Sequence, residues 1–271
     1  MPASQAEKIA AFRALHETGC FALPNPWDAG SARYLEALGF KAVASTSAGY
    51  AWSTGRLDYQ VTLDQLLDHL RALSAATDLP LNADFEGGYA VAPEGVAANV
   101  KRAIEAGVAG LSIEDRAESG AAEPLFDLDL AVDRIQAARR AIDETHTGVV
   151  LTARCENYLV GRPELAPTID RLIAYAEAGA DCLYAPGIAS DDDIRAVVKA
   201  VAPKPVNVIA FDYGWTTEHL ATLGVRRISL GGALARKAYA EAMNAAKAWL
   251  DTGKLGELTA KPPIPFPKVF G

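Results

Sequence analysis

Short apolar runs alternate with longer amphipathic stretches along almost the whole chain. Eight runs of five or six residues are too short for helices and too continuously apolar for strands with one exposed face. Strands of this kind are expected to be covered on both faces, as in a parallel sheet. The runs are FALPN (21–25), KAVAST (41–46), PLNAD (80–84), GLSIED (110–115), VVLTAR (149–154), DCLYAP (181–186), PVNVI (205–209) and RRISL (226–230).

The stretches between the runs have helical spacing of their apolar residues. They are Thr62–Ala75, Pro93–Ala106, Leu130–Glu144, Glu164–Ala178 and Asp191–Val201. A glycine often follows such a stretch just before the next run, which is typical of the left-handed residue that closes a helix. These glycines are Gly39, Gly107, Gly179 and Gly224.

Eight strand–helix units in one chain predict a closed parallel barrel. A doubly wound sheet would place a glycine fingerprint after its first strand, whereas PNPWDAGSAR follows here. We therefore predict a single α/β domain over residues 1–271, a (β/α)8 TIM barrel. A helix over Gln5–Glu17 is expected to cover the bottom of the barrel. Residues from about 252 to 271 are rich in proline and are expected to form an extended C-terminal tail.

The amino-acid composition limits the classes of binding partner that we expect. The 26 basic and 34 acidic residues give a net charge of −8, which argues against nucleic acid or an anionic membrane surface. A small anionic substrate stays compatible, because local charges in a pocket outweigh a weak global field. Three cysteines without a CxxC pair favour a reduced, cytoplasmic protein. We expect no signal peptide, because the first residues form an amphipathic pattern, and no run reaches the roughly 18 apolar residues of a membrane helix.

Acidic residues stand at the ends of two neighbouring predicted strands. The active site of a barrel forms at these C-terminal strand ends, where Asp84 and Glu114 lie. Their carboxylates would repel each other unless a cation lay between them, and oxygen ligands favour Mg2+ or Mn2+. The alternative is that each acid caps a helix or pairs with an arginine. Asp58, after the second run, would add charge to the same cation or its waters.

Arg154 ends an otherwise apolar strand, so its guanidinium is expected to enter the barrel mouth. There it would clamp a substrate carboxylate or a developing enolate oxygen. The alternative is an internal ion pair with Glu114 or Glu156, and the two roles are compatible.

The segment after the second run offers hydroxyl groups and a candidate lid. Ser45, Thr46 and Ser47 could bind an anion through hydroxyl and backbone N–H groups, or could form a helix cap or turn. The loop from Gly49 to Asp58 is long enough to act as a lid that excludes water, with a static loop as the alternative. No lysine ends the sixth run, which argues against a Schiff-base aldolase.

Four motifs in chain order resemble the isocitrate lyase/phosphoenolpyruvate mutase superfamily. They are STSAG, NADFEGGY, IED and TAR, after the second, third, fourth and fifth strands. Members are barrels that bind Mg2+ and 2-oxo or 2-hydroxy carboxylates. They make or break C–C or P–C bonds through an enolate-type intermediate, and many are tetramers that swap a C-terminal helix between subunits. The resemblance covers nearly the whole chain.

The resemblance also implies roles for individual residues. It places acids in a metal site, namely Asp84 and Glu114, with Asp58 in the outer network. It places a substrate carboxylate on Ser45 and the N–H groups that follow, and substrate contacts on Arg154 and Asn207. Arg154 and Asp58 are accordingly the expected catalytic residues.

Two departures from the family pattern shape the expected reaction. The family's DAD is NAD here, so Asn82 replaces an acid while Glu86 adds one, and both are further candidate metal ligands. The C–C lyases carry a catalytic cysteine in a lysine-rich loop after the fourth strand. The corresponding segment, RAESGAAEPLFD (116–127), has neither residue, and Cys155 lies at another strand end. The chain thus resembles a 2-methylisocitrate-lyase-like branch without the lyase cysteine loop.

We therefore expect a Mg2+-dependent enzyme, with Mn2+ as the alternative cofactor, that acts on a small 2-oxo or 2-hydroxy di- or tricarboxylate. The expected chemistry is C–C bond cleavage through a metal-stabilised enolate, and the general acid/base is not assigned. One alternative is an oxaloacetate-type hydrolase or decarboxylase. Another is a catalytically weak paralogue that binds an oxo-acid. The resemblance further implies a homo-oligomer, either a dimer or a tetramer.

Overall fold

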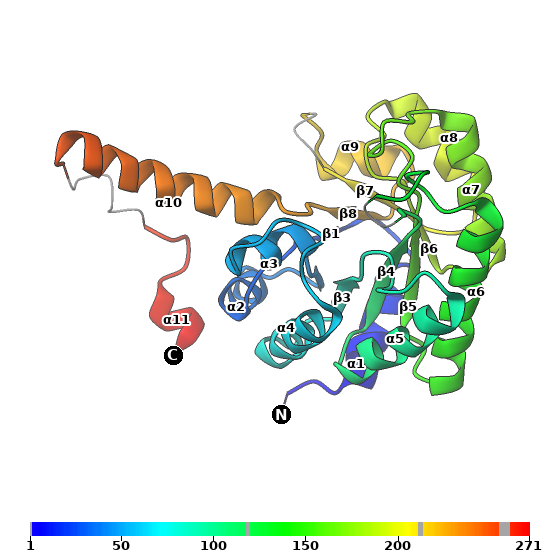
Figure 1. Cartoon of the computed structure of the whole chain (residues 1–271). Coiled ribbons are helices and arrows are strands. Elements are labelled where there is room, and N and C mark those ends of the chain that lie inside the picture. Colours follow the sequence, from blue (N-terminus) through cyan, green and yellow to red (C-terminus); the bar gives the residue numbers. More distant parts are fainter. Residues whose placement is uncertain (1, 118–119, 211–213, 255–260) are drawn as a thin grey trace.

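The computed structural model describes residues 2–117, 120–210, 214–254 and 261–271. Eight parallel strands form one sheet in the order β1-β8-β7-β6-β5-β4-β3-β2. At the seam between the first and last strands of this order, the Ala44 N–H donates to the Pro24 carbonyl over 3.0 Å. Helices surround the sheet (Figure 1), so the predicted (β/α)8 barrel is confirmed.

Each of the eight predicted runs contains one strand, and the strands are shorter than the runs because the run ends bend into loops. The strands are β1 (Phe21–Leu23), β2 (Val43–Ala44), β3 (Leu81–Asp84), β4 (Gly110–Glu114), β5 (Val150–Arg154), β6 (Cys182–Tyr184), β7 (Val206–Ile209) and β8 (Arg227–Ser229). The helices are α1 (Gln5–Leu15), α2 (Ala29–Ala37), α3 (Ser47–Ser53), α4 (Leu63–Ala76), α5 (Pro93–Glu105), α6 (Leu128–Thr145), α7 (Leu165–Glu177), α8 (Asp191–Val201), α9 (Thr217–Thr222), α10 (Ala233–Thr252) and α11 (Phe266–Phe270).

The two faces of the strands differ sharply in polarity. Along β4, Leu111 and Ile113 join the apolar core, whereas Ser112 lines a cavity inside the ring of strands. Alternate side chains of a strand share a face, which explains this division. Barrel interiors are usually filled by Val, Ile and Leu. The inner face here is therefore polar where an ordinary barrel would be packed with apolar side chains.

Helix α1 covers the bottom of the barrel, as predicted. Phe12 is fully buried, and its ring meets that of Phe21 at the start of β1 with centroids 6.2 Å apart. The Arg13 Nε donates to the Gly148 carbonyl, just before β5, over 2.6 Å. These contacts close the N-terminal ends of the strands, so any ligand must enter from the opposite end.

Two sequence predictions were wrong in part. The segment predicted as a loop over Gly49–Asp58 begins inside a helix, because α3 spans Ser47–Ser53 and the Thr46 hydroxyl accepts a hydrogen bond from the Gly49 N–H. The tail predicted as extended over 252–271 contains helix α11, whose first turn tolerates proline because no N–H is needed there. Residues 255–260 of that tail lie outside the described residues.

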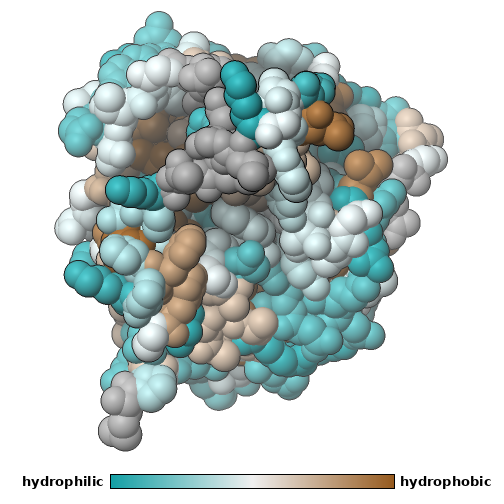
Figure 2. All heavy atoms as spheres, turned by 90° about the vertical axis from the view of Figure 1, so that its left-hand side faces the viewer, coloured by the Kyte–Doolittle hydropathy of each residue, from teal (hydrophilic) through white to brown (hydrophobic). Residues whose placement is uncertain are grey.

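Helix α10 leaves the barrel and projects to one side (Figure 1). Ala235 is its one buried residue among those the structure describes, while Trp249 is 52% exposed and Leu250 85% exposed. Seen from the side toward which α10 projects, hydrophobic patches lie among hydrophilic ones (Figure 2). The last long helix thus leaves much of its apolar surface open. Within the described ranges, no helix is both long and apolar enough to span a bilayer.

Candidate functional site at the barrel mouth

The barrel mouth is organised around Arg154, the last residue of β5. Its side chain is 12% exposed and forms ion pairs with three carboxylates. The nitrogen–oxygen distances are 2.7 Å to Asp84, 3.0 Å to Glu114 and 2.8 Å to Glu156. The internal ion pair predicted as one alternative is therefore present. The guanidinium bridges Asp84 and Glu114, the two acids expected to share a metal.

Burial and charge act against each other in this cluster. Burial raises the pKa values of Glu114 and Glu156, while Arg154 acts to lower them. Burial also disfavours the charged form of Arg154, but its carboxylate neighbours raise its pKa well above the ordinary value. The guanidinium consequently stays charged and compensates the buried acids around it.

Asp84 is tied to the segment that follows β2. Its N–H donates to Ser45 Oγ over 2.9 Å, and the Ser47 N–H donates to its Oδ2 over 3.0 Å. The Thr46 hydroxyl caps α3, so the helix-cap alternative holds for this residue. Ser45, Thr46 and Ser47 all line the inner cavity. The Ser45 and Thr46 hydroxyls and the Ser47 N–H, however, already form hydrogen bonds within the protein.

Two further acids, Asp58 and Glu86, lie near Asp84. Burial, followed by the charge of Asp84, raises the pKa of Asp58, and the same causes raise the pKa of Glu86 to about 8. Glu86 has a φ of 44°, in the left-handed region that non-glycine residues rarely adopt. Its Oε1 is buried without a hydrogen-bond partner in the described part of the chain. The mouth therefore carries more acid than Arg154 can compensate.

This acidic surplus fits a divalent cation. Carboxylate oxygens suit Mg2+ or Mn2+, and the unpartnered Glu86 Oε1 is the kind of atom that a cation stabilises. Asn82 is 3% exposed, and its amide oxygen also lacks a partner among the described residues. In the same ranges, no group of three His, Cys, Asp or Glu side chains is arranged so that it could hold a metal ion by itself. A cation here would complete its shell with water or substrate oxygens, as Mg2+ commonly does.

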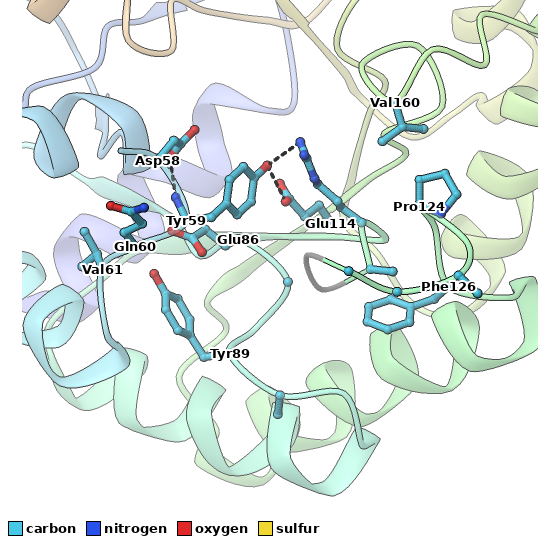
Figure 3. Close-up of a pocket in the computed structure, with 17 residues that line it drawn as sticks. Asp58, Tyr59, Gln60, Val61, Glu86, Tyr89, Glu114, Pro124, Phe126 and Val160 are labelled. Atoms are coloured by element: carbon cyan, nitrogen blue, oxygen red, sulfur yellow. Dashed lines mark hydrogen bonds between the residues drawn. The ribbon is translucent and has the colours of Figure 1, made fainter. Parts of the chain in front are cut away.

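Two cavities meet at this cluster. The inner one, of about 150 Å3, lies within the ring of strands and is lined by Ser45, Asp84, Arg154, Asn207 and Arg227, among others. The outer one, of about 920 Å3, lies between the loops after β2, β3 and β4, and its lining includes Tyr59, Glu86, Tyr89, Arg116 and Phe126 (Figure 3). Asp58 lines both cavities, so it lies at the boundary between them.

Tyr59 was not anticipated as a site residue. Its hydroxyl donates to Glu114 Oε1 over 2.9 Å, and the Arg116 guanidinium lies 4.6 Å from the centre of its ring (Figure 3). Tyr59 has a φ of 63°, again in the left-handed region. No periodic pattern marks a loop residue of this kind, so its position next to Asp58 was the one available signal.

Asn207, expected to contact substrate, lies deep in the inner cavity and is 1% exposed. Its amide donates to Ser229 Oγ over 3.0 Å and accepts from Arg227 Nε over 2.8 Å. Arg227 and Ser229 were not predicted as site residues. A signal was present, since they flank the apolar Ile228 in the last run and must share its opposite face.

The structure supports no nucleophilic role for Cys155. The side chain is fully buried, and burial raises the pKa of its thiol, which makes it inert. In the segment 116–127, Arg116 pairs with Leu125 through the backbone, while residues 118 and 119 lie outside the described ranges.

Comparison with known sequences identifies the relatives of the chain. The phosphoenolpyruvate phosphomutase family profile matches residues 12–250. An uncharacterized protein of Mycobacterium tuberculosis is 34% identical over 246 residues, which are 90% of each chain. Oxaloacetate decarboxylase of Bradyrhizobium sp. is 32% identical over 73% of this chain and 67% of its own. 2-Methylisocitrate lyase of Escherichia coli is 32% identical over 68% of this chain and 64% of its own.

Solved structures agree with this relationship. A Burkholderia cenocepacia protein that carries a provisional lyase/mutase name superposes with a TM-score of 0.92 at 47% identity, covering 98% of this chain and 95% of its own. An oxaloacetate acetylhydrolase bound to its product oxalate superposes with a TM-score of 0.86 at 29% identity, covering 99% and 93%. The chain belongs to the isocitrate lyase/phosphoenolpyruvate mutase superfamily and is an enzyme of its carbon–carbon lyase type.

Proposed function

We propose that this enzyme uses Mg2+, or Mn2+, to cleave a C–C bond in a small 2-oxo or 2-hydroxy di- or tricarboxylate. The observation that carries the proposal is the charged Arg154 held among three carboxylates beside a polar inner cavity. The fixed guanidinium of Arg154 can stabilise negative charge that develops on a reacting oxygen of the substrate. The surrounding acids hold the guanidinium in place, so little reorganisation is needed during the reaction.

The metal would be held by the acids of the mouth, with Asp84 and Glu114 as ligands or as partners of its waters and Asp58 in the outer network. Glu86 and Asn82 are further candidates because each has an unpartnered buried oxygen in the described part of the chain. When bound, Mg2+ would act as a Lewis acid on the 2-oxo oxygen of the substrate.

The protein's own residues would bind and orient the substrate. Arg154 is the candidate clamp for a carboxylate or a developing enolate oxygen. Ser45, Thr46 and Ser47 form the wall of the inner cavity next to it, and Asn207 lies deeper in the same cavity. Because the cavity is narrow and its bottom is closed by α1, bound substrate would be shielded from bulk water.

A second candidate is an oxaloacetate-type hydrolase or decarboxylase. The segment 116–127 has no cysteine and no lysine, so the residue expected to act as the acid in C–C lyases is absent there. Similarity to an oxaloacetate decarboxylase and an oxaloacetate acetylhydrolase points the same way. An inner cavity of about 150 Å3 also suits a four-carbon acid better than a tricarboxylate.

A substrate panel tests these proposals. Purified enzyme with Mg2+ is incubated with oxaloacetate, 2-methylisocitrate, isocitrate and 2,3-dimethylmalate, and the products are separated by chromatography. Oxalate plus acetate indicates hydrolysis, pyruvate plus CO2 indicates decarboxylation, and a 2-oxo acid plus a second carboxylic acid indicates a lyase. Binding of these acids without turnover of any of them would contradict both enzymatic proposals and favour an oxo-acid sensor.

We also propose a cytoplasmic homo-oligomer, a dimer or tetramer that exchanges its C-terminal helix. Support comes from α10, which projects from its own barrel with Met243, Trp249 and Leu250 exposed (Figure 1). An apolar cavity of about 210 Å3 between β1, β8 and α9 could receive an apolar side chain of a partner's helix. Light scattering on full-length enzyme tests this proposal, and a monomer at micromolar concentration would contradict it.

A further inference from the structure

Arg227 on β8 is a buried charge whose two partners are neutral. Its residue is 2% exposed. Nε donates to Asn207 Oδ1 over 2.8 Å, and a terminal nitrogen lies 3.4 Å from His16 Nε2. Among the described residues, no carboxylate comes within ion-pair distance of its guanidinium.

His16 cannot supply a negative charge, and its environment keeps it neutral. Its Nδ1 lies 2.8 Å from the Phe12 carbonyl and must donate to that oxygen, which leaves Nε2 as an acceptor facing Arg227. Burial, followed by the charge of Arg227, lowers the pKa of His16 to about 3. The guanidinium therefore has hydrogen-bond partners but no counter-charge.

Two other arginines of the barrel have carboxylate partners. Arg154 has three carboxylate partners, and the half-buried Arg171 is paired with Asp115 over 3.1 Å. Removing a guanidinium from water without a counter-charge is costly, so such groups are normally paired. An anion beside Arg227 would supply the counter-charge that Asn207 and His16 do not provide.

The inner cavity provides the place for that anion. Arg227 and Arg154 both line it, and Ser112, Asn207 and Ser229 contribute hydroxyl and amide groups to its wall. Its volume of about 150 Å3 is well below the roughly 300–1,000 Å3 of pockets for drug-sized ligands. The cavity is thus lined by two arginines and several hydroxyl and amide groups, and its volume suits a small ligand.

We propose that Arg227 binds the second carboxylate of a small dicarboxylate whose 2-oxo end lies at Arg154. The inference rests on the proposed function, and it narrows the substrate class from di- or tricarboxylates to dicarboxylates. A monocarboxylate of the same series would leave Arg227 without its counter-charge, so the site should reject it. Asn207, which accepts from Arg227 Nε, acts as a positioning residue for the guanidinium.

Paired ligands test the proposal by calorimetry in the presence of Mg2+. One is 3,3-difluorooxaloacetate, an inhibitor bound in a solved oxaloacetate acetylhydrolase, and the other is pyruvate, which lacks the second carboxylate. Wild-type enzyme should bind the dicarboxylate about 100-fold more tightly. Arg227→Gln should weaken dicarboxylate binding by about 30-fold or more, because it removes a buried charged partner. Pyruvate binding should change by less than about threefold, since pyruvate makes no contact with this charge.

Matched variants separate charge from packing. Arg227→Lys keeps the charge and should retain most of the preference for the dicarboxylate. Arg226→Gln changes the preceding residue, whose side chain bonds the Gly19 carbonyl, and should bind both ligands like wild type. Equal weakening of both ligands by Arg227→Gln, or no weakening, would overturn the role of Arg227 while leaving the proposed function intact. Failure of wild-type enzyme to bind either ligand would remove the proposed function and this inference with it.

A crystal of wild-type enzyme with 3,3-difluorooxaloacetate decides the matter even if Arg227→Gln does not fold. The second carboxylate within hydrogen-bond distance of Arg227 supports the proposal. The same carboxylate bound in the outer cavity beside Arg116 overturns it.

Discussion

Buried charged side chains have different surroundings at the closed end of the barrel and at its mouth. At the bottom, Lys8 is 6% exposed, and its ammonium donates to the carbonyls of Ser74 and Thr77 over 2.9 and 2.7 Å. Arg13 donates to a fixed carbonyl in the same region. These interactions are made within the chain, by residues that line neither the inner nor the outer cavity, so they stabilise the fold.

At the mouth, the interactions are incomplete without a ligand. Glu86 Oε1 and Glu156 Oε2 are buried without partners in the described ranges, and the backbone at Tyr59, Glu86 and Tyr89 is left-handed. Strain and unpaired polar groups of this kind persist where the surrounding structure enforces them, and they cluster at functional sites. The contrast teaches that the closed end of the barrel stabilises the fold, whereas the mouth has polar groups without partners that the proposed metal and substrate would bind.

The largest effect on catalysis is expected from Arg154→Met. The change removes the cation of the mouth and leaves Glu114 and Glu156 buried without their counter-charge. We expect kcat/KM to fall by about 1,000-fold, the scale of losing a fixed group that stabilises developing charge. Steady-state kinetics on the identified substrate measures the fall. Arg139→Gln is the control, since Arg139 pairs with Asp143 and Asp181 away from the mouth. Equal losses in the two variants would contradict the contrast between the ends.

The second largest effect is expected on Mg2+ affinity, from Asp84→Asn. Asp84→Asn keeps the shape of the side chain and an oxygen for the Ser47 N–H, but it removes one negative charge. We expect Mg2+ affinity to fall by about tenfold or more, because charged oxygen ligands dominate binding of this cation. Calorimetric titration with MgCl2 provides the measurement. Asp181→Asn, which neutralises an acid paired with Arg139, should bind Mg2+ normally. Unchanged affinity in Asp84→Asn would remove Asp84 from the metal site.

A pH-dependent effect is expected from Glu86. Burial and Asp84 raise its pKa in the folded protein to about 8, above the value of an exposed glutamate in the unfolded chain, about 4.3. Between these values the folded state binds the extra proton, so stability falls as pH rises through this window and levels off above about 8. Glu86→Gln cannot ionise and should gain stability relative to wild type over the same window.

Denaturant titrations of metal-free protein at pH 5 and pH 8 measure this difference. Wild type and Glu86→Gln should be closer in stability at pH 5 than at pH 8. Added Mg2+ should reduce the difference at pH 8, because a nearby cation favours the ionised carboxylate. A difference that is independent of pH would show that Glu86 is ionised throughout.

The smallest catalytic effect is expected at the bottom. Lys8→Met leaves two buried carbonyls without their donor and should cost about 1–3 kcal/mol of stability. Because the partners of Lys8, Ser74 and Thr77, line neither cavity of the mouth, kcat/KM should stay at the wild-type value at a temperature where the variant is folded. Lys101→Met, on an exposed pair with Glu144, is the control for stability and should change it little. Loss of activity in folded Lys8→Met would show that the two ends are coupled.

Much of the fold was predictable because it depends on local patterns. Each continuous apolar run produced a strand, and the spacing of apolar residues located α4, α5, α6, α7 and α8. The position of Asp84, Glu114 and Arg154 at strand ends followed from the same runs. Helix α3 was missed because it is short and begins with a serine, a residue equally typical of turns.

The sequence by itself determined which residues stand at the strand ends that form the mouth, because side-chain alternation and the order of the strands can be read along the chain. Only the tertiary structure decided how those residues are paired. Asp84 and Arg154 are 70 residues apart, as Tyr59 and Glu114 are 55 apart, and their contacts depend on barrel register and side-chain rotamers. The same closure places Arg227 inside the ring with neutral partners. Charge compensation in a barrel is a property of the closed ring, so no single run of sequence can reveal which charge lacks a partner.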